Sequence, residues 1–376
     1  MVCYVKILIA TYYYHALTGS ELFAFTLAEC LTLKGHSVCL YSPHIGGIIT
    51  QQTRKLSIPV YDDLLKLRQE KFDIIHASHN ITACETRYCF QHTPMVFLSH
   101  GVAPALEQPP IHDLNISKFL AVTEEVRDNL LRKGITRRET AIFRNIVNTD
   151  RFAPTQPLNS RPKKALIFSR KFDEVTKCAI QQACTLKRIE VEIVNDTVFD
   201  VETYMNQVDI IFTRGRGAIE AMATGRIVII PGDGLVTEKN FKEIQKCNFS
   251  GRRFHKNPNV TFFKDAIEKY DSTLGENNRS IALKYFSADL RVQKLIDIYR
   301  QVIHTYEDEV LDVNELTDIA GARMELTEIK HSISYKFMKF CASHIDKLFP
   351  DKTSRGNLRK NVISKLQNYD LKEKSS

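Results

Sequence analysis

Two glycines and a carboxylate lie close together in the second half of the chain. An apolar run over 208–212 predicts a buried strand, Gly215 and Gly217 follow it, and a helix that contains Glu220 continues to Gly225. The first amides of a helix have no partners inside the helix, so they attract anions. A carboxylate one turn further on can accept hydrogen bonds from ribose hydroxyls. The stretch therefore predicts a nucleotide site.

Simpler interpretations of the same stretch stay open. The two glycines can form an ordinary tight turn, and Glu220 can stabilise its own helix through the helix dipole. The spacing Gly-x-Gly-x-x-Glu lacks the third glycine of the dinucleotide fingerprint, which disfavours NAD as the ligand.

The elements that must position this stretch alternate along the chain. Apolar periodicity predicts helices over 21–34 and around 176–186. Short apolar runs predict strands over 6–10, 37–41, 73–76, 95–98, 119–122, 165–168, 191–194, 208–212 and 227–230. Such alternation predicts parallel sheets with helices on both faces, and ligands of such sheets bind beyond the carboxyl ends of the strands.

Length and composition limit the classes of protein to consider. A chain of 376 residues suits two domains and an extension, and 43% hydrophobic with 26% charged residues is typical of globular proteins. The net charge of +8 fits acidic ligands, a membrane surface or solubility alone. We find no secretory signal, no CxxC pair among the nine cysteines and no apolar run of membrane-spanning length, so we expect a cytoplasmic protein.

Nine short motifs occur in a fixed order along the chain. They are Thr18–Glu21, Lys34–Val38, Asp73–His79, Ser99–Gly101, Val122–Arg127, Arg144–Phe152, Phe168–Arg170, Glu220–Gly225 and Phe286–Ser287. In this order and spacing they resemble glycosyltransferase family 4, the retaining nucleotide-sugar transferases of GT-B fold. The resemblance spans roughly residues 5–305, and Glu-Ala-Met-Ala-Thr-Gly at Glu220 is nearly identical to the family's Glu-Ala-Met-Ala-x-Gly.

The resemblance implies a fold and a set of domains. We expect an α/β protein with two doubly wound Rossmann-like domains that face a cleft. The N-terminal domain, 1–150, would lie on the acceptor side, and the C-terminal domain, 151–285, would bind the nucleotide sugar. The helix 286–305 would return to the first domain, and 306–376 would form a charged helical extension.

The family's chemistry assigns roles to particular residues. Negative charge builds on the leaving β-phosphate, and basic groups and helix N-termini stabilise it in the transition state. The resemblance implies His100, Arg170 and Lys177 as catalytic residues, with Lys171 competing for the place of Lys177. It implies a donor site made of Gly19, Arg170, Arg214, Gly215, Arg216, Gly217 and Glu220. The nucleotide sugar is a substrate, and no cofactor is expected.

The chain also departs from the family pattern. The family's second glutamate, which grips the donor sugar, falls on Phe212, and no acidic residue lies between Asp209 and Glu220. Arg214 and Arg216 occupy this loop instead. The sugar is then held differently, or it carries an acidic group, or activity is lost.

Neither a metal nor a nucleic acid is expected to bind. His76 and His79 lie three residues apart near a strand end and point to opposite faces, which suits one zinc ion poorly. The chain has no Asp-x-Asp pair, and no nucleic-acid motif accompanies the modest net charge. We expect no metal site.

The tail contains a basic amphipathic segment over 331–349. Its apolar residues recur at helical spacing and lysines lie nearby, so it can contact an anionic membrane surface at the inner face of the membrane. The alternative is a helix that packs on its own protein or on a second copy in a homo-oligomer.

These patterns together predict a glycosyltransferase. It would transfer a sugar from a nucleotide-sugar donor to a glycan or lipid-linked acceptor. The family resemblance implies that the transfer retains the anomeric configuration and needs no bound metal. Two alternatives stay open: another enzyme on the same fold, such as a nucleotide-sugar epimerase or a phosphorylase, and a catalytically degenerate scaffold or partner subunit.

Overall fold

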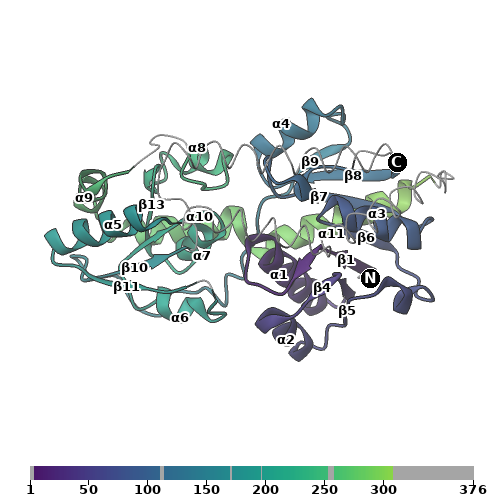
Figure 1. The fold of residues 1–376 in the computed structure, drawn as a ribbon, viewed down its shortest axis with the longest axis horizontal. Coiled ribbons are helices and arrows are strands. Elements are labelled where there is room, and N and C mark those ends of the chain that lie inside the picture. The colour runs from purple at the N-terminus through teal and green to yellow at the C-terminus, as the bar shows by residue number, and fades with distance from the viewer. Residues whose placement is uncertain (1–3, 111–113, 170–171, 196, 253–257, 308–376) are drawn as a thin grey trace, which may run out of the picture. The chain divides into compact units, whose positions relative to one another are not determined.

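Two mainly parallel β-sheets form the framework of the computed structural model (Figure 1). The structure describes residues 4–110, 114–169, 172–195, 197–252 and 258–307. The predicted extension over 306–376 therefore lies outside the described residues, apart from 306 and 307. Residues 1–311 form one compact unit that contains both sheets.

The first lobe, residues 4–142, is built around a seven-stranded parallel sheet of order β5-β3-β1-β6-β7-β8-β9. Its strands are β1 Lys6–Ala10, β3 Ser37–Tyr41, β5 Val60–Tyr61, β6 Ile74–Ala77, β7 Met95–Ser99, β8 Ile116–Ala121 and β9 Thr140–Ile142. The strand order reverses between β1 and β6, which opens a crevice beyond their carboxyl ends.

Helices cover this sheet on both faces. They are α1 Gly19–Leu33, α2 Gly47–Lys55, α3 Asn80–Cys89 and α4 Glu124–Arg132, with short 3-10 turns η1 Leu64–Leu67 and η2 Ala105–Glu107. Two short strands, β2 Tyr13–Tyr14 and β4 His44–Ile45, pair beside the sheet. The late helix α11, Ala288–Thr305, contacts α1 and places Val292, Leu295 and Tyr299 in the core of this lobe.

The second lobe, residues 164–286, has a five-stranded sheet of order β11-β10-β12-β13-β14, in which only β14 runs antiparallel. The strands are β10 Lys164–Phe168, β11 Glu190–Ile193, β12 Ile210–Thr213, β13 Ile227–Ile230 and β14 Gly234–Leu235. The helices are α5 Glu174–Leu186, α6 Val201–Met205, α7 Arg216–Ala223, α8 Phe241–Lys246, α9 Val260–Glu268 and α10 Leu274–Phe286. The strand order reverses between β10 and β12.

The topology confirms the predicted fold class, an α/β protein with two doubly wound sheets. The central strands of the second sheet are fully buried. Every residue of β12 and β13 is buried, as expected for a parallel sheet with helices on both faces. The two points where strand order reverses are where α/β sheets bind ligands. The turn before α1 lies at this point in the first lobe, and the turn before α7 lies at it in the second.

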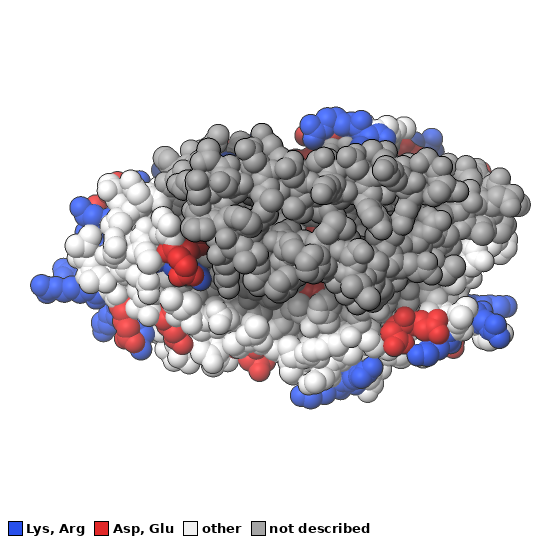
Figure 2. All heavy atoms as spheres, in the orientation of Figure 1, with Lys and Arg blue, Asp and Glu red and all other residues white. Residues whose placement is uncertain are grey.

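The described surface carries both signs of charge. On the face drawn in Figure 2, groups of lysine and arginine lie near groups of aspartate and glutamate around the described part of the periphery. No helix in the described ranges has the length and apolar character needed to cross a bilayer. Within the same ranges, no cluster of three or more histidine, cysteine or acidic side chains is placed to bind a metal.

Candidate functional site: a cleft lined by both lobes

A cleft of about 680 Å³ is lined by loops that follow strands of both sheets. The first lobe contributes the start of α1, the turn after β7 and the start of α4. The second lobe contributes the ends of β10 and β12, the start of α7 and the loop after α8. Its volume falls within the range of sites that hold small molecules.

Most of the predicted site residues lie along this cleft. Its lining includes His100, Gly19, Arg214, Gly215, Arg216, Gly217 and Glu220. Arg170 and its neighbour Lys171 lie outside the described residues. Lys177 is not brought to the cleft: its Nζ lies 2.8 Å from Glu174 on the same helix.

The turn between β12 and α7 needs both of its glycines. Gly215 has a φ of 59°, a conformation that side chains rarely adopt. A Cβ on Gly217 would lie 2.4 Å from the Thr213 Oγ1 and 3.2 Å from the Phe168 ring, so only glycine lets α7 approach the end of β10 this closely. The helix has no side-chain cap at its N-terminus, and the buried Thr213 hydroxyl has no hydrogen-bond partner in the described structure. This turn thus provides a compact site for an anion.

Glu220 is held in a buried ion pair with Arg216, one turn earlier on α7. The Arg216 Nε lies 2.7 Å from Glu220 Oε1, and the two residues are only 8% and 3% exposed. Burial raises the pKa of Glu220, and the Arg216 charge opposes that rise. Both residues belong to the predicted donor site, and their i,i+4 spacing is the one that brings helix side chains together, but the ion pair itself was not predicted.

Arg216 also joins the two lobes. Its two terminal nitrogens donate to the Ile146 carbonyl and to the Thr26 hydroxyl of α1, each at 2.9 Å. Thr26 lies 190 positions earlier in the chain. One guanidinium therefore fixes a donor-loop carboxylate and the first lobe at the same time.

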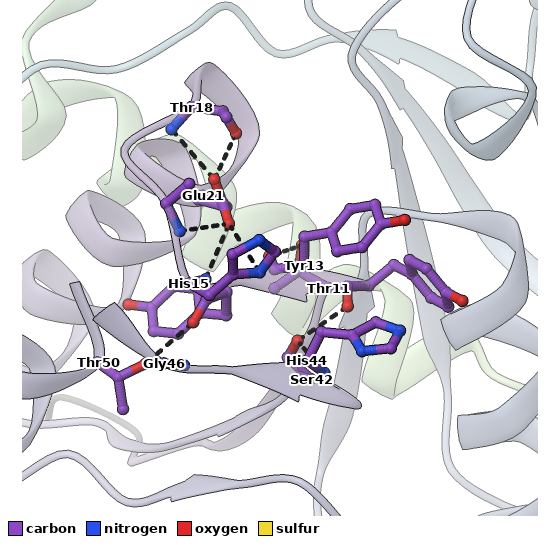
Figure 3. Close-up of polar contacts among 12 residues, drawn as sticks. Thr11, Tyr13, His15, Thr18, Glu21, Ser42, His44, Gly46 and Thr50 are labelled. Carbon is purple, nitrogen blue, oxygen red and sulfur yellow. Dashed lines mark hydrogen bonds and ion pairs between the residues drawn. The ribbon is translucent and has the colours of Figure 1, made fainter. Parts of the chain in front are cut away.

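Glu21 organises the turn that carries Gly19 into the cleft (Figure 3). One of its oxygens accepts the amides of His15 and Ala16 at 2.9 and 3.0 Å, and the other accepts the amide and the hydroxyl of Thr18 at 3.1 and 2.6 Å. The side chain is 1% exposed. Thr18–Glu21 was predicted only as a family motif, but Thr-x-x-Glu is also the signature of a capping box, which the structure contains.

His100 presents a neutral imidazole at the first-lobe side of the cleft. Its Nε2 is buried and has no hydrogen-bond partner in the described structure, and its ring packs edge-on against Phe23 with centroids 5.1 Å apart. Burial holds the pKa of His100 well below its usual value, and the nearby His79, His76 and Arg216 lower it further. At neutral pH the ring can therefore polarise a hydroxyl but carries no charge.

The two other histidines of this region have structural partners. The His79 Nδ1 accepts the Tyr12 amide at 3.0 Å, which places the ring proton on Nε2, and burial lowers the pKa of His79 to about 4. The His76 Nδ1 lies 2.7 Å from the Tyr299 hydroxyl of α11, and burial lowers its pKa to about 3.

Phe212 does not reach the cleft. It is fully buried in the core of the second lobe, where its ring packs edge-on against Phe263 with centroids 5.8 Å apart. The position at which the family resemblance expects a sugar-holding carboxylate is thus part of the core. Thr213 and Arg214 are the residues of this strand end that line the cleft.

Comparison with known proteins agrees with this architecture. Residues 17–151 match the sequence pattern of the family described as Glycosyltransferase Family 4, which confirms the predicted resemblance for that part of the chain. Curated proteins give no match.

Solved structures share the whole fold. A glycosyltransferase from Rickettsia africae superposes with a TM-score of 0.61 at 17% identity, covering 81% of this chain and all of its own. HepE from Anabaena, solved with UDP-glucose, gives 0.58 at 14% identity, covering 79% of this chain and all of its own. A putative UDP-N-acetylglucosamine 2-epimerase from Listeria monocytogenes gives 0.53 at 13%, covering 82% of this chain and all of its own. The chain therefore has the GT-B fold.

Proposed function

We propose that this chain is a glycosyltransferase that moves a sugar from a nucleotide-sugar donor to a glycan or lipid-linked acceptor, with retention and without a bound metal, in polysaccharide biosynthesis. One observation carries the proposal. A single cleft combines an uncapped helix N-terminus and a buried carboxylate, Glu220, with a half-buried neutral imidazole, His100, from the opposite lobe.

The second lobe supplies the donor site. The start of α7 is proposed to take the diphosphate, because the first amides of a helix have no partners inside the helix and attract anions. Glu220 takes the ribose. A carboxylate has about four acceptor positions on two oxygens, so ribose hydroxyls can bind Glu220 while Arg216 keeps its bond to Oε1. The UDP and UDP-glucose complexes of proteins with this fold support a nucleotide sugar as the ligand.

The chemistry requires stabilisation of the leaving group. As the bond to the sugar breaks, negative charge grows on the β-phosphate, and preorganised amides stabilise it more in the transition state than in the ground state. Arg170 is proposed to add a positive charge there. His100 is proposed to hydrogen-bond a hydroxyl of the transferred sugar through its otherwise unpartnered Nε2.

A second enzyme class has a specific observation in its favour. The putative epimerase from Listeria has the same fold, so the same cleft can in principle serve isomerisation of a free nucleotide sugar. The loss of an acidic residue at Phe212 favours a third alternative, a scaffold that has lost activity.

Two measurements separate these functions. Thermal-shift screening against UDP, GDP, CDP and ADP is expected to find at least one that stabilises the protein, because a ligand at 100 times its Kd adds about 2.7 kcal/mol. A nucleotide sugar of that base should then be hydrolysed slowly without an acceptor. Glu220→Gln and His100→Ala should abolish the hydrolysis, while Arg137→Gln, an exposed change outside the cleft, should not.

The opposing outcomes are equally distinct. Isomerisation of the intact nucleotide sugar would replace the transferase with the epimerase. Absence of any nucleotide-dependent shift would support the scaffold.

A further inference from the structure

We propose that Arg214 selects a donor whose sugar carries a carboxylate. The inference rests on the proposed donor site and names the class of sugar it takes. The end of β12 carries Phe212 where the family resemblance expects a glutamate, and Arg214 follows two residues later. Phe212 points into the core, and the next side chain to reach the cleft with a charge is that of Arg214.

The Arg214 guanidinium is held in place by contacts with neighbouring backbone and an aromatic ring. Its Nη2 donates to the Pro231 carbonyl at 3.2 Å, and its Cζ lies over the Phe172 ring, 5.1 Å from the ring centroid. A Cβ on Gly251 would come within 2.8 Å of its Nε, so the backbone after α8 packs closely against it. These contacts fix the side chain on three sides.

Part of the hydrogen-bonding capacity of Arg214 is unused. Its Nε is buried against the backbone of Gly251 without a partner, and no hydrogen bond of its Nη1 occurs among the described residues, so Nη1 is the donor that can face a ligand. Burial lowers the pKa of Arg214, and the charges of Asp233 and Asp173 oppose that change. A planar guanidinium with free donors matches the two oxygens of a carboxylate.

The order of strands places Arg214 on the sugar side of the donor site. Glu220 shares a small pocket with Phe199 and Val201, which follow β11. Arg214 instead bonds Pro231, which follows β13, and β11 and β13 lie on opposite sides of β12. A donor with its ribose at Glu220 and its diphosphate at the start of α7 therefore extends its sugar toward Arg214.

A second arginine lies on the same side. Arg252, in the loop after α8, lines the cleft and approaches Glu125 of the first lobe at 3.4 Å, with both side chains partly in solvent. Such an exposed pair is weak. This end of the cleft thus has two arginines, and of these Arg252 is partly offset by Glu125.

Arg214 could bind the diphosphate of the donor in place of a carboxylate on its sugar, so the experiment must distinguish these two anions. We would measure binding by calorimetry for UDP, UDP-glucose and UDP-glucuronate, or for the corresponding three ligands of whichever base stabilises the protein. The wild type is expected to bind the glucuronate donor about tenfold or more tightly than the glucose donor, a difference of about 1.4 kcal/mol.

Variants test whether Arg214 causes the difference. Arg214→Gln should remove the preference for the glucuronate donor and leave the affinity for the nucleoside diphosphate unchanged, which also shows that the variant is folded. Arg214→Lys should keep part of the preference. Arg137→Gln, which removes one exposed positive charge away from the cleft, should keep all of it.

Three results would overturn the inference. Equal affinity of the wild type for both sugars would contradict it while leaving the proposed function intact. An equal loss for all three ligands in Arg214→Gln would make Arg214 a diphosphate ligand instead. Failure of every nucleoside diphosphate to bind would reject the proposed function itself, and this inference with it.

Discussion

Replacement of Arg216 by methionine tests the buried pair that joins the donor loop to the first lobe. The change leaves Glu220 with 3% exposure and without its cation, and it removes the donors to Ile146 and Thr26. Removing one partner of a buried ion pair lowers the free energy of unfolding by about 3–5 kcal/mol. We therefore expect Arg216→Met to lower the free energy of unfolding by about 3 kcal/mol at pH 8.

The loss should depend on pH in a defined direction. Burial already raises the pKa of Glu220, and removal of Arg216 raises it further because the opposing charge is gone. A carboxyl group with a raised folded pKa binds its proton more tightly when folded, so its stability contribution is full at low pH and is lost as pH rises through the folded pKa. The deficit of Arg216→Met should thus shrink from pH 8 to pH 5.

Urea unfolding of the wild type, Arg216→Met and Arg216→Met/Glu220→Met at both pH values measures this effect. The double variant should recover much of the loss, because it leaves no buried charge. A deficit below about 1 kcal/mol that is independent of pH would refute the reasoning, since an exposed pair contributes only that much.

Three further predictions concern the cleft and the tail. Gly217→Ala should destabilise the protein by about 1–3 kcal/mol and weaken nucleotide binding, and Thr213→Ala in the same chain should restore part of both, as measured by unfolding and calorimetry. The rate of donor hydrolysis should show no histidine titration between pH 6 and 8, because burial keeps the pKa of His100 well below that window; a bell-shaped profile centred there would contradict this. Removal of residues 331–376 should lower binding to anionic liposomes without changing nucleotide affinity, and equal liposome binding by both forms would reject the membrane role.

Long, regular elements could be predicted closely from the sequence. The predicted strands 6–10, 37–41 and 227–230 have the bounds of β1, β3 and β13, because continuous apolar runs flanked by glycine or polar residues leave little freedom. Strand β8 begins three residues before the predicted start, at Ile116, because the polar Ser117 and Lys118 separate Ile116 from the apolar run. The two-residue strands β2, β4, β5 and β14 were not predicted, because such short segments carry no periodic signal.

The position of the cleft followed from topology, but its internal contacts did not. Residues after strand ends were expected to meet, and those of β7, β10 and β12 do. The bond from Arg216 to Thr26 depends on side-chain geometry across lobes, which neither spacing nor composition encodes. Lys177 was predicted at the site but lies away from the cleft. Helix α5 begins at Glu174 after the capping Asp173, so Lys177 lies one turn along the helix and pairs with Glu174.

A crystal structure with a bound nucleoside diphosphate tests the central claim most directly. The account predicts ribose hydroxyls within hydrogen-bond distance of Glu220, the diphosphate against the first amides of α7, and the open end of the ligand directed toward Arg214. A nucleotide bound elsewhere on the chain, or one in the cleft that leaves Glu220 without a ligand contact, would contradict it.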